Sequence, residues 1–249
     1  EKKGGADVNT YDALWRWSVK NIDSFWDAVW DFCDIIGDKG DRVLINENAM
    51  PGAQFFPDAH LNYAENLLRR RDTAPAIIYT DERGYERQLT FAELYSAVYD
   101  WQQALLKAGI EKGDRVAGYL PNMPETVIAM LATTSLGAIW SSASPDFGAQ
   151  AILDRFGQIA PKLLISVDGY YYNGKHIDCC DKLAEIQSQL DSLQQTVVIP
   201  FADDAPDISI LANSVLSRDF ITSQTSGDGE MVFERVPFNQ PLFILYSSG

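Results

Sequence analysis

The chain has few of the residues that build metal centres and disulfide frameworks. Its 249 residues include only three cysteines and two histidines, with no C-x-x-C and no H-x-x-x-H pattern. An odd cysteine count, with Cys179 and Cys180 adjacent, argues against a set of paired disulfides. So few potential ligands also argue against zinc. We therefore expect no metal site in the chain and a reducing, cytoplasmic location.

Basic residues and long apolar runs are also scarce. Lysine and arginine number 20 against 35 aspartates and glutamates, which gives a formal net charge of -15 at pH 7. Nucleic acids and anionic membranes attract basic surfaces, so we expect neither as a partner. No apolar run reaches the roughly 20 residues that a membrane span needs. A small anionic ligand stays compatible with this composition, because local cations and backbone N–H groups are enough to bind one.

The chain does have many short apolar runs separated by amphipathic stretches. Strand patterns cover residues 76–79, 85–89, 116–120, 137–140, 163–167 and 196–199. Helical patterns cover residues 24–36, 62–71, 91–108, 125–136, 146–159 and 182–193. Thr90 and Glu93 form a capping box before the third of these helices, and Gly109 suits its end. Strands that alternate with helices predict an α/β fold, with a mostly parallel sheet flanked by helices.

Polar residues follow the predicted strands at the positions where ligands of such sheets bind. The binding edge lies beyond the carboxyl ends of the strands. The apolar run 241–245 predicts a buried strand that leads into Tyr246, Ser247, Ser248 and Gly249. Hydroxyls and backbone N–H groups at such a turn suit a phosphate, and glycine lets the backbone come close. A plain exit from a strand is the simpler explanation of Ser-Ser-Gly taken alone.

Other roles for the serines remain as alternatives. A hydrolase nucleophile at Ser247 or Ser248 is disfavoured, because Leu245 and Tyr246 stand where the G-x-S-x-G elbow needs its first glycine. Three further serines follow the strand at 137–140, and we expect them to cap the helix that starts near residue 146. They are Ser141, Ser142 and Ser144. A non-catalytic, partner-binding α/β domain is the alternative of another class.

Several motifs occur along the chain in a fixed order. They cover residues 90–94, 106–117, 120–125, 137–139 and 246–249. Each is weak alone, but in order and spacing the set resembles the adenylate-forming acyl-CoA synthetases, and the likeness covers nearly the whole chain. The resemblance implies the N-terminal part of the large domain of such an enzyme. In that family the phosphate loop normally continues after Ser-Ser-Gly as Thr-Thr-Gly-x-Pro-Lys.

Further segments indicate a branch of this family. Residues 26–30 and 55–68 are similar to the extension found in the acetyl- and acetoacetyl-CoA synthetase branch. Residues 139–148 and 154–162 look like the acetoacetyl members, whereas acetyl members usually carry a Phe-Gly-Gly sequence after Gly-Ala. The resemblance implies that residues 1–72 are an N-terminal extension of the acetyl- and acetoacetyl-CoA synthetase type. Residues 73–249 are then the first part of the AMP-binding domain, truncated within the phosphate loop. An acetyl- or propionyl-CoA synthetase remains the alternative, because the acyl pocket is expected beyond residue 249.

The resemblance also implies chemistry in two steps. A carboxylate, here acetoacetate, attacks the α-phosphate of ATP with Mg²⁺, and the thiol of CoA then displaces AMP from the acyl-adenylate. ATP, Mg²⁺ and CoA are thus implied for the full-length parent. Ser247, Ser248 and Gly249 are implied to bind the ATP phosphates. No catalytic residue is expected within this chain, so we expect it to be inactive without a C-terminal remainder.

A CoA-binding role is implied for the loop at residues 168–175. Acetyl-type relatives carry arginines in the matching loop, near the CoA nucleotide. Here Lys175 can replace one arginine, and Tyr172 falls roughly where another would be. Lysine offers a point charge for phosphate, and tyrosine can stack on adenine. A solvated loop without a ligand is an equally good explanation of these residues.

Overall fold

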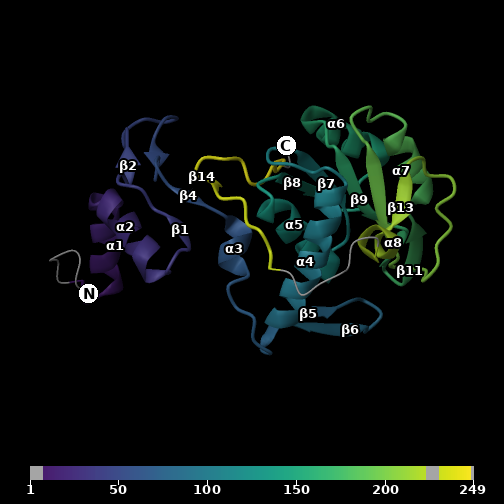
Figure 1. Ribbon diagram of the computed structural model, residues 1–249, viewed down its shortest axis with the longest axis horizontal. Coiled ribbons are helices and arrows are strands. Elements are labelled where there is room, and N and C mark those ends of the chain that lie inside the picture. Colours follow the sequence, from purple (N-terminus) through teal and green to yellow (C-terminus); the bar gives the residue numbers. More distant parts are fainter. Residues whose placement is uncertain (1–7, 223–229, 248–249) are drawn as a thin grey trace. The chain divides into compact units, whose positions relative to one another are not determined.

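The structure is a computed structural model that describes residues 8–222 and 230–247 (Figure 1). The chain divides into two compact units. The first comprises Glu1–Asn66 and Arg235–Gln240, and the second comprises Leu67–Glu234 and Pro241–Gly249. A short C-terminal segment thus returns to the N-terminal unit.

The first unit combines two helices with very short strands. Its elements are α1 (Tyr11–Lys20), α2 (Ile22–Phe32), β1 (Gly37–Asp38), β2 (Leu44–Ile45), β3 (Gln54–Phe55), β4 (His60–Leu61), α3 (Tyr63–Leu67) and β14 (Val236–Pro237). Strands β1, β4 and β14 form one antiparallel sheet, and β2 pairs with β3. A small core gathers around Trp30, Phe56 and Ala59. The helix predicted over 24–36 is shorter than expected, because Asp34 takes a left-handed φ of 50° just after α2.

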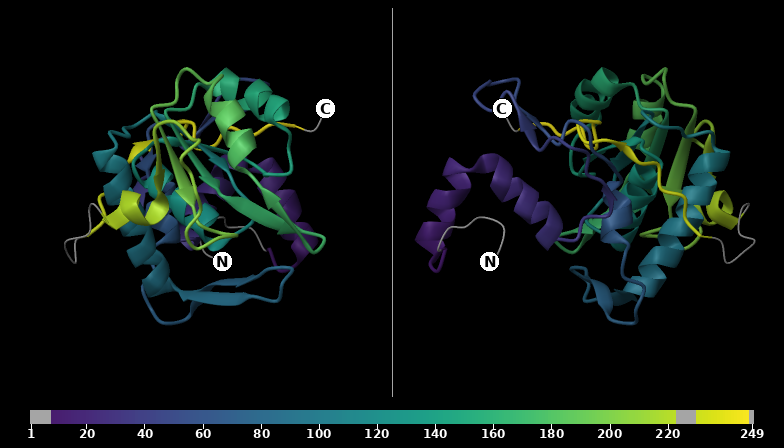
Figure 2. Two further views of the ribbon diagram at one scale, coloured as in Figure 1. Left: turned by 90° about the vertical axis from the view of Figure 1, so that its right-hand side faces the viewer. Right: turned by 60° about the vertical axis from the view of Figure 1, so that its left-hand side comes forward.

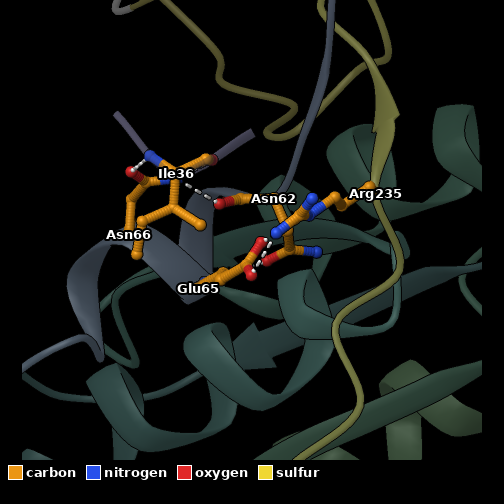
Figure 3. A network of polar contacts seen from close by, with 5 residues as sticks. All are labelled: Ile36, Asn62, Glu65, Asn66 and Arg235. Atoms are coloured by element: carbon orange, nitrogen blue, oxygen red, sulfur yellow. Dashed lines mark hydrogen bonds and ion pairs between the residues drawn. The ribbon is translucent and has the colours of Figure 1, made fainter. Parts of the chain in front are cut away.

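Helix α3 is tied to distant parts of this unit by side-chain contacts (Figure 3). The Asn66 side-chain oxygen accepts from the Ile36 N–H at 2.8 Å, and its amide nitrogen donates to the Ile36 carbonyl at 2.9 Å. Glu65 and Arg235 form a two-pronged ion pair at 3.0 and 2.8 Å. Asn62 accepts from the Glu65 N–H at 3.1 Å and so caps the start of the helix. These polar side-chain contacts therefore hold residues up to 170 positions apart in the sequence.

The second unit contains the parallel sheet that the sequence predicts. Its strand order is β13-β12-β9-β7-β8, and each neighbouring pair is parallel. The strands are β7 (Arg115–Tyr119), β8 (Ile139–Ala143), β9 (Leu163–Val167), β12 (Gln195–Ile199) and β13 (Ser214–Leu216). The helices are α4 (Phe91–Lys107), α5 (Pro124–Ser135), α6 (Ala149–Ile159), α7 (Cys180–Gln187) and α8 (Ser217–Thr222). The predicted α/β fold with a parallel sheet flanked by helices is confirmed.

The sheet strands are apolar because helices cover both faces. All five residues of β9 are buried, as are the last four of β7. The chain moves from β7 outward to β8 and then back past β7 to β9 and β12. Since such crossovers are right-handed, the reversal places α5 on one face and α6 and α7 on the other (Figures 1 and 2). Continuous apolar strands of this kind are typical of parallel sheets.

Helix α4 begins and ends as its sequence indicates. The Thr90 hydroxyl accepts from the Glu93 N–H, and the Glu93 carboxylate accepts from the Thr90 N–H, which completes the capping box. At the other end Gly109 has a φ of 75°, and the Ile110 N–H donates to the Leu105 carbonyl at 3.0 Å. This pattern is a Schellman motif, which favours glycine.

Candidate functional site

The carboxyl edge of the sheet has a reversal point at β7. The chain leaves β7 and continues into β8, which lies on one side of β7 in the sheet. The next strand of this sheet, β9, lies on the other side of β7. Ligands of open α/β sheets bind at such a point, beyond the carboxyl ends of the strands. Tyr119 ends β7 and Asp168 follows β9 directly, so both lie at this position.

The segment before Ser247 lies along β8 without becoming a strand. The Trp140 N–H donates to the Leu242 carbonyl at 3.1 Å, and the Ile244 N–H donates to the Trp140 carbonyl at 2.9 Å. These two bonds form one isolated parallel bridge, and the Leu245 side chain is 78% exposed. The predicted buried strand at 241–245 is therefore wrong. Pro241 has no backbone N–H group to donate to a neighbouring strand. The two backbone hydrogen bonds described above both involve Trp140, which is too few for a β-ladder.

The predicted phosphate-binding residues begin where this segment ends. Ser247 is exposed at the carboxyl edge, next to a Tyr246 hydroxyl that donates to the Arg155 carbonyl at 2.6 Å. Ser248 and Gly249 lie outside the described residues. The direction of the chain thus brings Ser247 to the ligand-binding edge of the sheet, and its role in binding phosphate stays a prediction.

Ser141, Ser142 and Ser144 do not cap α6, so that expectation is wrong. Ser141 and Ser142 lie within β8 itself, and the N-cap of α6 is Gly148, which makes no side-chain capping bond. The buried Ser141 hydroxyl instead donates to the Ile244 carbonyl at 2.8 Å. Ser141 therefore fixes the segment that leads to Ser247, a contact between residues 103 positions apart.

The loop between β8 and α6, residues 144–148, is held from two sides. On one side, Lys182 Nζ donates to the Pro145 carbonyl at 2.7 Å, and the Tyr119 hydroxyl lies 2.8 Å from the Pro145 carbonyl and 2.6 Å from that of Phe147. Burial raises the pKa of the Tyr119 phenol, which keeps it a donor. On the other side, the Arg155 guanidinium lies 4.8 Å from the centre of the Phe147 ring.

The region at residues 168–175 is a β-hairpin and not the predicted loop. Strands β10 (Gly169–Tyr172) and β11 (Lys175–Asp178) pair in antiparallel register, with Tyr172 opposite Lys175. Asn173 and Gly174 both take positive φ, at 51° and 72°, as a type I′ turn requires. Tyr172 is 67% exposed and Lys175 is also exposed. The hairpin therefore brings the two predicted CoA-binding side chains together in solvent, and their role stays a prediction.

Asp168 organises the carboxyl edge, although the sequence analysis assigned it no role. Its buried carboxylate accepts from three successive backbone N–H groups, those of Phe201, Ala202 and Asp203, at 2.6 to 3.2 Å. Its own carbonyl accepts from the Cys179 N–H at 2.8 Å. An acidic residue placed directly after an apolar strand is the signal that identifies such a group.

A cavity of about 810 Å³ opens beside this edge. Residues of the β5–β6 hairpin, of the turn after β7 and of the loop after β12 line it; β5 is Pro75–Thr80 and β6 is Glu86–Thr90. Arg83 lies 4.1 Å over the Tyr171 ring and pairs with Asp81. Burial raises the pKa of Asp81, but the hydrogen bonds from Arg83 and Tyr85 outweigh burial and hold that pKa below 3.8. The Arg87–Glu125 pair also lines the cavity, so its charges largely compensate each other.

Residues 8–222 and 230–247 contain neither a membrane-spanning helix nor a cluster of metal ligands. None of the described helices is long and apolar enough to cross a membrane. The same part of the chain holds no group of three or more histidine, cysteine, aspartate or glutamate side chains that could bind a metal ion.

Comparison with known families identifies the larger unit. A sequence model of the family described as AMP-binding enzyme matches residues 64–249. The chain belongs to the family of AMP-binding enzymes. A second family model, described as acetyl-coenzyme A synthetase N-terminus, matches residues 11–67. The boundaries predicted at residues 72 and 73 stay a prediction.

Individual relatives place the chain within the AMP-binding family. An acetoacetyl-coenzyme A synthetase of Rhizobium meliloti is 48% identical over 246 residues, which cover 98% of this chain and 37% of that protein. A malonamoyl-CoA synthetase of Penicillium aethiopicum is 35% identical over 260 residues, covering 100% of this chain and 36% of the relative. The solved structure of acetoacetyl-CoA synthetase from Streptomyces lividans superposes with a TM-score of 0.88 at 43% identity, over 100% of this chain and 38% of that one. The resemblance to acetoacetyl-CoA synthetases is confirmed, and the chain spans about 37% of these relatives' length.

Proposed function

We propose that the full-length protein containing this chain activates acetoacetate with ATP and transfers the acyl group to CoA. The products are acetoacetyl-CoA, AMP and pyrophosphate. The observation that carries the proposal is the 48% identity to an acetoacetyl-coenzyme A synthetase across 98% of the chain. The malonamoyl relative supports it, because malonamoyl and acetoacetyl groups both carry a carbonyl at the β position.

The role of this chain in the reaction is mainly to position the reacting groups. Attack of a carboxylate on the α-phosphate of ATP depends on alignment and on stabilising the negative charge that develops. Ser247 is exposed at the carboxyl edge of the sheet, where its hydroxyl is open to a phosphate oxygen. With Ser248 and Gly249 it forms the start of the proposed phosphate loop. A Mg²⁺ ion bound to ATP would neutralise part of the phosphate charge.

The second step is proposed to use the β10–β11 hairpin. Tyr172 and Lys175 face each other across its end, so that one CoA nucleotide can contact an aromatic ring and an ammonium group together. The turn at the end of the hairpin is held in place, because the N–H groups of Asn173 and Gly174 donate to the Glu82 carboxylate at 2.8 and 3.0 Å. Because this turn is already ordered before CoA binds, less conformational entropy is lost on binding.

The same proposal divides the full-length protein into three parts. Residues 1–72 are an N-terminal extension and residues 73–249 the first part of the AMP-binding domain. A C-terminal remainder of the same chain supplies the acyl pocket and the rest of the catalytic groups. The enzyme acts in the cytoplasm on small molecules, without nucleic acid or membrane.

Substrate preference in the full-length enzyme tests the main proposal. We expect kcat/KM for acetoacetate to exceed that for acetate and propionate by at least about tenfold, because a polar contact to the keto oxygen discriminates strongly. Malonamate should rank next. Coupled detection of AMP release provides the rates. A preference for acetate or propionate would assign the protein to the acetyl- or propionyl-CoA synthetases instead.

Two variants test the CoA contacts in the same enzyme. Lys175→Ala and Tyr172→Ala should each raise KM for CoA by roughly tenfold, because the first loses a charge-assisted contact to phosphate and the second loses a ring that stacks on adenine. ATP–pyrophosphate exchange, which needs no CoA, should stay at the wild-type rate. Lys107→Ala, at the end of α4, is the control. An unchanged KM for CoA in both variants would show that the hairpin is only a solvated surface feature.

A further inference from the structure

The ammonium group of Lys182 has unusual surroundings. It lies 2.7 Å from the Pro145 carbonyl and within 5.7 Å of the ring centres of Tyr119 and Tyr170. Among the described residues, no carboxylate pairs with it. A half-buried cation held by one carbonyl and two aromatic faces still makes favourable contacts, but it forms no ion pair. Its hydrogen bond fixes a loop instead.

That loop connects Lys182 to the start of the proposed phosphate loop. Phe147 lies two residues after Pro145, and its ring packs under the Arg155 guanidinium at 4.8 Å. The same guanidinium lies 5.9 Å from the Tyr246 ring, and the Tyr246 hydroxyl donates to the Arg155 carbonyl at 2.6 Å. Tyr246 precedes Ser247 in the chain. A continuous series of contacts therefore runs from α7 to the residue before Ser247.

Tyr119 adds a second support from the sheet itself. It is fully buried at the end of β7, and its hydroxyl lies within 2.8 Å of the Pro145 and Phe147 carbonyls. A phenol has one hydrogen to donate, so Lys182 supplies the second donor that these two carbonyls need. The two side chains together satisfy both carbonyls of the loop.

We propose that Lys182 and Tyr119 are positioning residues for adenylation: they fix the loop at residues 144–148, against which Tyr246, and hence the adjoining Ser247, is set. This inference rests on the proposed function. Neither side chain need contact a substrate. Loss of either donor lets the loop shift, and a shift of about 1 Å in a group that aligns phosphates is enough to slow the reaction substantially.

Kinetics of the full-length enzyme test the inference. Lys182→Met keeps an unbranched side chain that is only one atom shorter, but it removes the donor and the charge. We expect it to lower kcat/KM for ATP in ATP–pyrophosphate exchange by about tenfold or more, and to change KM for CoA much less. Tyr119→Phe should act in the same direction. Lys182→Arg should recover most of the activity, because arginine can donate to the carbonyl and stack on the rings.

A matched control separates positioning from general destabilisation. Lys112→Met makes the same change near the opposite edge of the sheet, in a partly exposed pair with Glu234, and should leave the exchange rate unaltered. Rates are measured well below the melting temperature of each variant, with the folded fraction checked by circular dichroism. The inference is overturned if Lys182→Met exchanges pyrophosphate like wild type, or if Lys182→Arg is no better than Lys182→Met.

A substrate-free measurement keeps the inference distinct from the proposed function. Hydrogen exchange by mass spectrometry should show faster exchange of residues 144–148 in Lys182→Met than in wild type, and no change there in Lys112→Met. Wild-type enzyme that fails to exchange pyrophosphate with acetoacetate would contradict the proposed function. Unchanged hydrogen exchange at residues 144–148 would instead contradict the anchoring role of Lys182.

Discussion

At the scale of single residues, Gly118 shows how the sheet depends on one missing side chain. A Cβ atom at this position would lie 2.6 and 2.7 Å from two ring atoms of Trp140 on the neighbouring strand. Real Cβ contacts of that length essentially never occur. The Trp140 ring is 4% exposed and has little freedom to move. Its backbone also carries both hydrogen bonds to the segment before Ser247.

We therefore expect Gly118→Ala to destabilise the protein by about 1–3 kcal/mol, the range for overpacked cores. Gly157→Ala is the control, because a Cβ there meets nothing within 4 Å and the residue lies inside α6. It should stabilise the protein by roughly 0.5–1 kcal/mol. Thermal unfolding of the full-length protein followed by circular dichroism reports both. Equal melting temperatures in the two variants would show that Trp140 relaxes without cost.

Some residue-level features were predictable from the sequence and others were not. The capping box of Thr90 and Glu93 is local, with partners three positions apart, so its motif was enough. The bond from Lys182 to Pro145 joins residues 37 positions apart on α7 and on the loop after β8. Lys182 and Pro145 come together only because of the order of the strands in the sheet. No local sequence pattern indicates that contact.

At the scale of elements, predictions succeeded where burial dictates sequence. Strand β9 is buried on both faces, so its apolar run at residues 163–167 identified it without ambiguity. The run at 241–245 is equally apolar but has only β8 beside it among the described residues, and no ladder forms. An apolar run indicates that a segment is buried. A strand also needs a neighbouring strand whose backbone groups form hydrogen bonds with its own.

The β10–β11 hairpin was missed for a different reason. Asn173-Gly174 is the strongest short-range signal for a type I′ turn, and both residues take the positive φ that such a turn needs. The resemblance implied a CoA-binding loop on the basis of the charge at Lys175, whereas the hairpin follows from the turn residues Asn173 and Gly174. Element boundaries also shifted: α7 ends at Gln187, where residues 182–193 were predicted to be helical.

At the scale of the whole molecule, the two units correspond to two kinds of sequence signal. The sheet unit follows from strand–helix alternation, which is a property of the sequence itself. The first unit closes only when Arg235–Gln240 returns to it, through the pairing of Val236 with Leu61 and the ion pair of Arg235 with Glu65. Contacts 170 positions apart leave no local pattern in the sequence.

The chain of residues 1–249 should be inactive when it is produced by itself. We expect it to show no ATP–pyrophosphate exchange above background with acetoacetate, because stabilising polyphosphate charge takes several converging donors. Near the carboxyl edge, the cations Arg155 and Lys182 already donate to backbone carbonyls. The relatives are also far longer, since the chain spans about 37% of them. Purified chain and full-length enzyme are assayed side by side at equal concentration. Exchange by the shorter chain within tenfold of the full-length rate would mean that the adenylation groups lie within these 249 residues.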